Sequence, residues 1–244
     1  LSRGLGDVYK RQVFLQLIVM IMSFAPLGVF CLIGKFVIAD GLDIFQDVVA
    51  YVVLLITLLL FHAAFTYSFF IKVIGGLNPI TFFKKMKDVV LFAFSTSSSA
   101  ATIPVTLKTA NQDLGVNQNV ASFVVPVGAT INMDGTAIMQ GLATVFIAQM
   151  SGIDLTLFQY MQVVLLAVAT SIGTAAVPSA GTITLIIILQ QFNLPLEAIG
   201  IILAVDRVLD MIRTSVNVTG DAAIACIVAK TENQLDENIF NSKA

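Results

Sequence analysis

The sequence predicts an all-α membrane protein, and three observations support this prediction. Hydrophobic residues make up 57% of the 244 residues and charged residues only 11%, whereas a soluble domain carries about 25% charged residues. Uncharged stretches long enough to cross a bilayer recur along the chain, and polar or helix-breaking clusters interrupt the later ones. The polar residues of the last stretch return at helical spacing. We therefore expect membrane lipid around the protein and no nucleic-acid partner.

The N-terminal part predicts two transmembrane helices. Residues 1–12, LSRGLGDVYKRQ, look like a translated cloning adapter and are left out of the fold. Residues 13–39 are apolar except for Lys35, and residues 48–71 carry no charge and one histidine, His62, which we interpret as a core residue without a functional role. Both runs exceed the roughly 20 residues that span a bilayer. Because residue 13 begins inside an apolar run, we expect a C-terminal fragment of a longer protein.

A re-entrant hairpin is predicted for residues 88–107. Lysines lie on both sides of this stretch, and cytoplasmic loops are enriched in lysine. Within the stretch, the serine-rich residues 95–99 and Pro104 interrupt the apolar pattern. Both flanks stay on the cytoplasmic side if the segment enters and leaves from there, with the serines at its tip. The flanking lysines are Lys84, Lys85, Lys87 and Lys108.

A second interrupted segment occupies residues 155–196, which are uncharged and contain the breaker-rich run 171–181. Two short membrane spans or a second hairpin, from the opposite side, both fit this pattern. The first hairpin leads into a helix broken at residues 132–136, and the second segment leads into a helix carrying Asn217 and Asp221. These two units suggest an inverted repeat, and in transporters binding sites lie where such repeats meet.

The last helix carries a polar stripe. Its members are spaced by 4, 3, 4 and 4 residues, which places them on one helical face; they are Asp206, Asp210, Arg213, Asn217 and Asp221. A charge at mid-bilayer costs about 3 kcal/mol on insertion scales, so the stripe must face protein, water or ligand. An ion-pair ladder between helices is one interpretation, and Asp206 fits it by pairing with Arg207 or a neighbouring helix. The alternative is a ligand site, because a guanidinium such as Arg213 binds a carboxylate bidentately and Asp210 suits an ammonium group.

Hard oxygen ligands accompany this stripe. The side chains of Asn132, Asp134, Asn217 and Asp221, with backbone carbonyls freed at helix breaks, suit a small cation. The alternative for residues 132–136 is a plain Asn-Asp-Gly turn between two short helices. The two predicted tips would offer backbone amides to a carboxylate; the alternative for each tip is a flexible polar loop at the membrane surface.

Four motifs, taken together, resemble the dicarboxylate/amino acid:cation symporters, which include glutamate and aspartate transporters. The motifs are Ser97-Ser98-Ser99 with Ile103-Pro104, Asn132-Met133-Asp134-Gly135-Thr136, Gly173-Thr174-Ala175-Ala176-Val177-Pro178, and Asp210-Met211-Ile212-Arg213-Thr214 with Asn217-Val218-Thr219-Gly220-Asp221. The resemblance runs over residues 13–230. It implies a multi-pass homotrimer of the plasma (inner) membrane whose protomers move a transport domain as an elevator. Residues 13–45 would be a scaffold helix, 46–230 the transport domain without its N-terminal helix, and 231–244 a cytoplasmic tail.

The resemblance also implies residue roles. Arg213 would bind the side-chain carboxylate of the substrate and Asp210 its amino group. Further substrate contacts would come from Ser99, Thr136, Val177, Gly181, Thr214 and Asn217. Gly128, Asn132, Asn217 and Asp221 would hold one sodium ion. A second site would use Thr130, Ser171, Ile172 and Thr174 through backbone carbonyls, and a third Asn132 and Asp134 with the missing helix.

The expected function is therefore import of glutamate or aspartate, coupled to sodium or protons, by a protein that is not an enzyme. Members of the family carry an arginine in the first hairpin or beside the substrate acid, and here those places hold Ser97 and Met211. A C4-dicarboxylate or neutral amino-acid symporter of the same family is the alternative. An intramembrane aspartyl protease fits less well, because Asp206 and Asp210 lie on one helix, and an anion channel is a third possibility.

Overall fold

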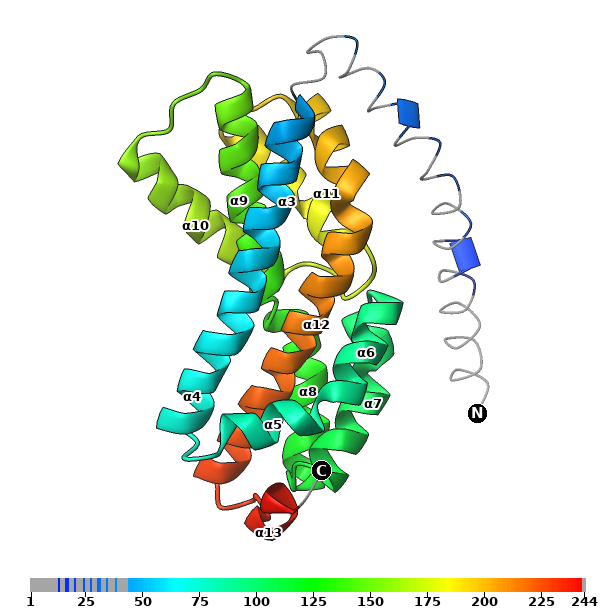
Figure 1. Ribbon diagram of the computed structural model, residues 1–244, viewed down its shortest axis with the longest axis vertical. Helices are drawn as coiled ribbons and strands as arrows, with labels where there is room; N and C mark the ends of the chain where they lie inside the picture. The colour runs from blue at the N-terminus through cyan, green and yellow to red at the C-terminus, as the bar shows by residue number, and fades with distance from the viewer. Residues whose placement is uncertain are drawn as a thin grey trace.

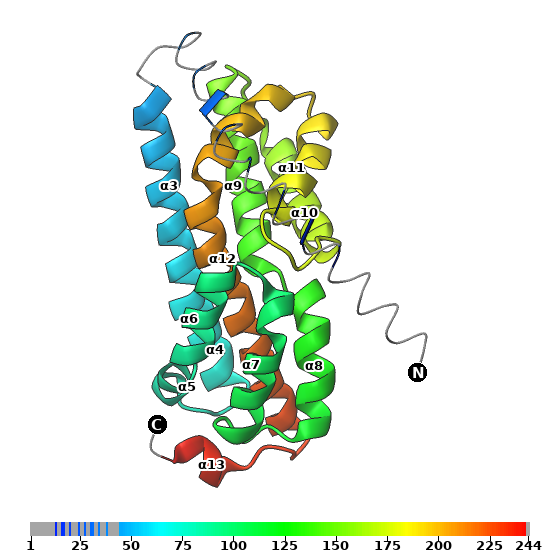
Figure 2. The same ribbon diagram turned by 90° about the vertical axis from the view of Figure 1, so that its right-hand side faces the viewer.

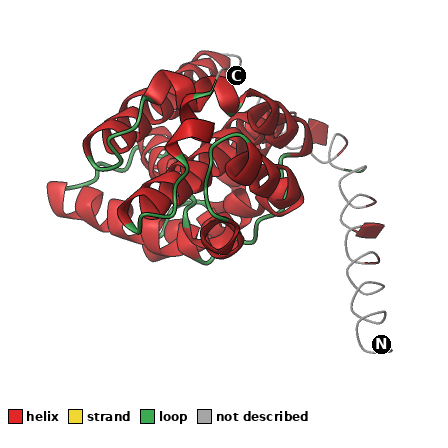
Figure 3. Cartoon of the chain, turned by 90° about the horizontal axis from the view of Figure 1, so that it is seen from below, coloured by secondary structure: helices red, strands yellow, loops and turns green. Residues whose placement is uncertain are grey.

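The computed structural model describes residues 44–242 and scattered positions between residues 13 and 38. The adapter-like residues 1–12 and the body of the helix expected at 13–39 therefore lie outside the described residues. Within 44–242 the chain forms helices joined by loops, with one isolated antiparallel bridge between Val116 and Leu235 and no strand (Figure 3). The all-α prediction is confirmed for this part.

The expected helix at 48–71 is present and longer than predicted. Helix α3 (Ile44–Phe61) continues through a π-helical segment, η1 (His62–Tyr67), into α4 (Ser68–Val73). Residues Phe45–Val73 form the one helix in the described part that is long and apolar enough to cross a membrane. Many of its apolar side chains are exposed, as a lipid-facing helix requires.

The first predicted hairpin is a pair of helices. After α5 (Pro79–Lys85), α6 (Lys87–Thr96) and α7 (Ser99–Gln112) are joined by Ser97, which adopts a left-handed φ of 49°, and by Ser98, which caps α7. Lys85 Nζ donates to the carbonyl of Asp113 at 2.8 Å, so both flanks of the pair lie at one end of the molecule.

Pro104 was expected to interrupt this stretch, and that expectation was wrong, because the residue lies inside the continuous helix α7. A proline within a helix removes one N–H donor and its hydrogen bond. The break falls instead at the serines, where the left-handed Ser97 ends α6.

The helix predicted to break at residues 132–136 does so. Helix α8 (Gln118–Ile131) ends before Asn132, and α9 (Asp134–Met150) begins after Met133. Asn132 and Met133 have ψ values of 69° and 52°, outside the helical range. The break exposes backbone groups inside the bundle, where they are available to a ligand.

The second interrupted segment is also a helix pair. Helices α10 (Leu157–Ile172) and α11 (Ala180–Gln191) are joined by residues 173–179. This loop meets the tip of the first pair, because Ser98 Oγ donates to the carbonyl of Ala176 at 2.8 Å and the Ala100 N–H donates to the same oxygen at 3.3 Å. The two tips thus meet in the middle of the molecule (Figure 1).

One long helix organises the whole bundle. After η2 (Leu196–Ala198), α12 (Ile199–Thr231) runs for 33 residues, or about 50 Å, and a short α13 (Glu237–Asn241) follows. Helices α3, α6, α7, α8, α9 and α11 all contact α12 (Figures 1 and 2). The polar stripe on α12 therefore lies at the centre of the packing.

Candidate functional site

The polar stripe of α12 is buried along its whole length. Exposed fractions range from 2% to 4%, for Asp206, Asp210, Arg213, Asn217 and Asp221. The prediction from their spacing, that all five share one inward face, is confirmed. Burying charges in a helical bundle is costly unless they are paired or bind a ligand, so their partners define what the site can do.

Arg213 lies between two acids of its own helix. Its Nη2 is 2.5 Å from Asp210 Oδ1 and 3.5 Å from Asp206 Oδ1. Its Nη1 is buried and has no hydrogen-bond partner among the described residues, and neither has Asp206 Oδ2. Since a guanidinium carries five donors, half of this fork remains available.

The sequence led us to expect Arg213 and Asp210 each to bind one end of a ligand, whereas here they bind each other. Buried opposite charges pair because an isolated buried charge is costly. Asp210 also accepts the Ser179 N–H at Oδ2, at 2.9 Å. A zwitterionic ligand would bind here by exchanging partners: its carboxylate would take the guanidinium, and its ammonium would take the acid.

Asp206 is an ion-pair residue, but its partner differs from those considered. Arg207 points outward and is exposed, while Asp206 pairs with Arg213 and accepts a 2.8 Å hydrogen bond from Thr182 of α11. Asp206, Asp210 and Arg213 lie on successive turns of one helical face, so both acids are within reach of the guanidinium. The second helix pair is thereby linked to the arginine through a side chain.

Two close approaches shape the walls of the arginine site. A Cβ atom on Gly181 of α11 would lie 2.8 Å from Thr136 Cγ2 and 3.4 Å from Arg213 Cζ. A Cβ on Gly135 of α9 would lie 3.0 Å from Arg213 Cγ. Glycine at both positions lets α9 pack against the aliphatic stem of Arg213 and α11 pack against its guanidinium.

The structure brings together most of the residues predicted to contact a substrate. Asn217 accepts the Gly135 N–H at 2.8 Å and donates to Thr136 Oγ1 at 3.3 Å. Thr214 follows Arg213 and is buried. Ser99 and Val177 each adjoin one of the residues through which the two tips bond, Ala100 and Ala176. The predicted substrate set thus comes from both helix pairs, from α9 and from α12.

The first predicted cation site forms a compact cluster. Asn132 Nδ2 donates to Asp221 Oδ1 at 3.0 Å and to the Asn217 carbonyl at 3.5 Å. A Cβ on Gly128 would lie 2.6 Å from Asp221 Oδ1. Within residues 44–242, Asp221 forms no ion pair. A buried carboxylate beside a side-chain amide and a backbone carbonyl supplies oxygens of the kind that a hard cation binds.

Asp134, predicted for another cation site, contacts the π-helical segment. His62 Nε2 lies 3.2 Å from Asp134 Oδ2, and Tyr67 donates its hydroxyl to the same oxygen at 3.1 Å and to the Val216 carbonyl at 3.2 Å. π-Helical turns often occur at functional sites. His62, to which we assigned no role, therefore contacts Asp134, a candidate cation ligand. Tyr67 is a second partner of Asp134, which the sequence did not reveal.

The remaining predicted cation site is less developed. Thr130 is exposed and donates to Val127, while Ser171 and Thr174 are buried and donate within α10. Ile172 is half exposed at the end of α10. Helices α8 and α10 pack together, but within residues 44–242 no hydrogen bond joins Thr130 to residues 171–174.

Gln140 is a further polar residue that the sequence did not single out. Fully buried in α9, it donates through Nε2 to the Gly181 carbonyl at 3.0 Å and to Thr184 Oγ1 at 2.6 Å, and it accepts from Thr170 Oγ1 at 2.8 Å. One amide thus ties both arms of the second helix pair to α9. A glutamine in an apolar helix predicts buried hydrogen bonds, but the sequence gives no signal for which residues are its partners.

The fold and the site define a helical membrane protein whose polar centre is enclosed by two facing helix pairs. Residues 9–231 match the model of the sodium:dicarboxylate symporter family. The chain is 42% identical over 220 residues to excitatory amino acid transporter 2 of Homo sapiens, covering 89% of this chain and 38% of the relative. It is 41% identical over 223 residues to an excitatory amino acid transporter of Caenorhabditis elegans, covering 91% and 44%.

The mouse excitatory amino acid transporter 3 is 40% identical over 231 residues, covering 94% of this chain and 44% of that protein. The chain belongs to the sodium:dicarboxylate symporter family, a family of membrane transporters. The resemblance drawn from the four motifs is confirmed. The chain spans less than half the length of these relatives.

Proposed function

We propose that this protein is part of a symporter that imports acidic amino acids, glutamate or aspartate, and that sodium drives the import, with protons as the alternative coupling ion. The excitatory amino acid transporters among its relatives support an amino-acid substrate. The family description supports sodium and a dicarboxylate.

The observation that carries the proposal is the buried guanidinium of Arg213 with an unpartnered Nη1 beside Asp210. A substrate carboxylate would take the guanidinium, and the freed Asp210 would accept the substrate ammonium. A neutral amino acid would leave the guanidinium without a carboxylate, and a dicarboxylate without an amino group would leave Asp210 without a cation. An acidic amino acid satisfies both.

Sodium would bind where Asp221 lies buried with Asn132, Asn217 and Gly128, because a cation there would neutralise the carboxylate. The carbonyls of residues 171–174 with Thr130 would bind a second ion, and Asn132 with Asp134 would bind a third. Asn217 belongs to both the substrate and the cation set, so a bound ion would orient the side chain that holds Gly135 and Thr136.

The two helix pairs would be re-entrant hairpins whose tips close over the substrate, and residues 46–230 would move together as an elevator against a scaffold that includes residues 13–45. The protein would be a homotrimer of the plasma (inner) membrane with residues 231–244 in the cytoplasm. Lys84, Lys85, Lys87 and Lys108 support this orientation, since they lie at the same end of the first pair.

The test is ligand-dependent thermal stabilisation of the purified protein, with L-aspartate, L-glutamate, succinate or L-serine, in sodium chloride and in choline chloride. Stabilisation by the two acidic amino acids in sodium alone is the expected result, because a ligand that binds the folded state raises its stability. Strongest stabilisation by succinate would indicate a dicarboxylate carrier. Strongest stabilisation by serine would indicate a neutral amino-acid carrier. If the acidic amino acids stabilise the protein as much in choline as in sodium, and this stabilisation changes with pH, the coupling ion would be the proton.

A further inference from the structure

The chain beyond α12 folds back onto the opposite end of the bundle from the second hairpin. The turn is made at Asn233, which has a φ of 55°, and the Gln234 N–H donates to the Ala229 carbonyl at 2.7 Å. Asparagine tolerates this left-handed conformation better than most residues. We call residues 232–242 the strap.

The strap pairs with the turn between α7 and α8. The Asn117 N–H donates to the Gln234 carbonyl at 2.9 Å, and the Asp236 N–H donates to the Gly115 carbonyl at 2.8 Å, which makes the antiparallel bridge. Gly115 has a φ of 71°, and a Cβ atom there would lie 2.3 Å from the Asp236 carbonyl oxygen. This contact therefore requires glycine for two separate reasons.

The far end of the strap is anchored by a buried lysine. Lys85 is 7% exposed, and its Nζ donates to the Asp113 carbonyl at 2.8 Å, to the Ile239 carbonyl at 2.7 Å and to Ser242 Oγ at 3.2 Å. Phe240 of α13 is fully buried, and Asp236 caps α13. Three carbonyl and hydroxyl oxygens around one ammonium satisfy all of its donors.

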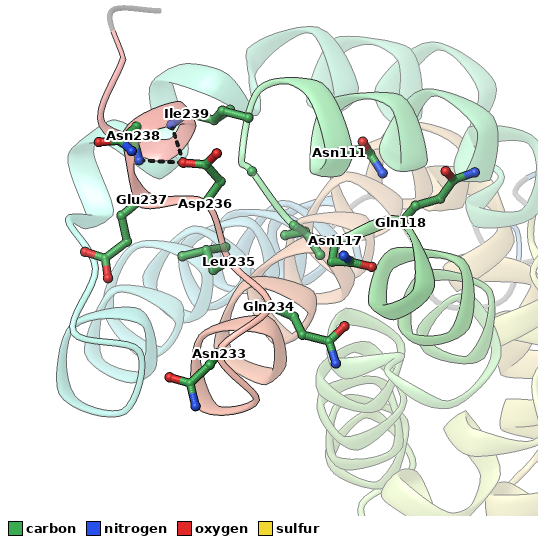
Figure 4. A pocket seen from close by; sticks show the side chains of 12 residues that line it. Asn111, Asn117, Gln118, Asn233, Gln234, Leu235, Asp236, Glu237, Asn238 and Ile239 are labelled. Carbon is green, nitrogen blue, oxygen red and sulfur yellow. Dashed lines mark hydrogen bonds between the residues drawn. The ribbon is translucent and has the colours of Figure 1, made fainter.

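Figure 4 shows the strap running past the α7–α8 turn, with a pocket between them lined largely by amide side chains. Asn117 and Gln234 lie on its two sides, and Asp236 turns back onto the start of α13. The strap is thus fixed by backbone pairing and by Lys85, while most of its exposed side chains are polar.

These contacts tie α8 to α12 at both ends. At its start, α8 is held through Val116 and Asn117 to the strap that extends α12; at its end, Asn132 contacts Asp221 of α12. The 14 residues of α8 form one continuous helix about 21 Å long, with Pro126 inside it, and this helix connects the strap contacts to Asn132. We propose that the strap is a positioning element that sets the register of α8 against α12 and thereby holds Asn132 beside Asp221.

This inference rests on the proposed sodium site only for its functional consequence. Loss of the strap contacts would let α8 slide along α12, so the oxygens around Asp221 would no longer be held in place for a cation. The affinity for sodium falls as a result, although no residue of the strap would touch the ion.

The test is Gly115→Ala, with Gly152→Ala as the matched control. Both glycines have a positive φ, but a Cβ on Gly152 would meet nothing within 4 Å. In hydrogen–deuterium exchange, Gly115→Ala should accelerate exchange of residues 232–242 and 113–118 by about tenfold or more, and Gly152→Ala should leave both segments as in the wild type. Unchanged exchange in folded Gly115→Ala would show that the contact with Gly115 does not hold the strap in place.

A second pair of variants probes the other anchor. Lys85→Met removes the buried ammonium, while Lys84→Met makes the same change at an exposed position of α5. Only Lys85→Met should accelerate exchange of residues 237–242, so the proposal can be tested even where Gly115→Ala does not fold.

Sodium titration of thermal stability then tests the positioning role. The half-saturating sodium concentration should rise about fivefold or more in Gly115→Ala and in Lys85→Met and stay unchanged in Gly152→Ala and Lys84→Met. A loosened strap with unchanged sodium affinity would overturn the positioning claim. A wild-type protein that sodium does not stabilise would overturn the proposed sodium site instead, and the exchange measurement would still decide whether the strap is docked.

Discussion

The backbone N–H of Ser179 donates to Oδ2 of Asp210 at 2.9 Å. This bond holds the loop of the second hairpin directly on the acid that pairs with Arg213. In the proposed site, a ligand group that takes Asp210 would compete with this loop and with the arginine at once. Ligand binding would then be coupled to the position of the second helix pair through this one carboxylate.

Asp210→Asn should lower the affinity for L-aspartate about 100-fold, or about 3 kcal/mol, because the amide keeps an acceptor for Ser179 but loses the charge that pairs with an ammonium. Competition binding with labelled aspartate measures the effect. Asp88→Asn makes the same change at an exposed position of α6 and should bind like the wild type. Retained aspartate affinity in Asp210→Asn would show that another group binds the ammonium.

Asp221→Asn should abolish the stabilisation of the protein by sodium. Without sodium the variant should unfold at the same temperature as the wild type or higher, because a buried carboxylate without an ion-pair partner is removed. With sodium, only the wild type should gain stability. Sodium titrations of the melting temperature measure both, and equal sodium dependence in the two proteins would remove Asp221 from the cation site.

Gly181→Ala should destabilise the protein by about 1–3 kcal/mol, because the added methyl group would lie 2.8 Å from Thr136 Cγ2 and push α11 away from α9. Aspartate affinity should fall with it, since the added Cβ would also lie 3.4 Å from Arg213 Cζ. Gly141→Ala is the matched control within α9: its Cβ would meet nothing within 4 Å, and the helix should gain up to about 1 kcal/mol. Chemical denaturation of both variants checks the opposite signs.

Gln140→Leu should loosen the second hairpin at little cost in volume. The loss of its hydrogen bonds to Gly181, Thr184 and Thr170 should cost about 1–3 kcal/mol. With Ala180→Cys as a reporter, buried at the start of α11, maleimide labelling without substrate should be about tenfold faster.

Gln149→Leu repeats this change at an exposed position of α9 and should label at the parent rate. Cys226 is fully buried in α12 and should stay unreactive while the protein is folded, whereas Cys31 is an exposed free cysteine, so every labelled variant also carries Cys31→Ser. Equal labelling of the Gln140 and Gln149 variants would mean that the amide does not hold the hairpin closed.

The sequence predicted the helices and most of their breaks because both are local properties. Apolar length predicted the helix containing residues 48–71, and residues 132–136 and 171–181 predicted the interruptions. Pro104 was misjudged, because a breaker in the sequence does not always end a helix in a packed bundle. The spacing from Asp206 to Asp221 predicted the buried face of α12 through helical geometry alone.

The partners of Gln140, His62 and Lys85 were not local properties, so the sequence did not reveal them. Lys85 contacts Ile239 across more than 150 positions of the chain, and spacing along one helix gives no signal for such a contact. The ion-pair interpretation of Asp206 named Arg207 or a neighbouring helix as the partner, and only the packing identified Arg213.

The sequence by itself determined that this is a helical membrane protein of the symporter family, with acids and an arginine on one face of its last helix. Periodicity, charge and motif order depend only on neighbouring residues, so they can be read from the chain. The tertiary structure decided that Arg213 pairs with Asp210, that Asn132 contacts Asp221 and that the strap contacts Gly115. Those contacts arise where separate helices pack, and burial makes each polar group there bond to whichever partner the fold brings within reach.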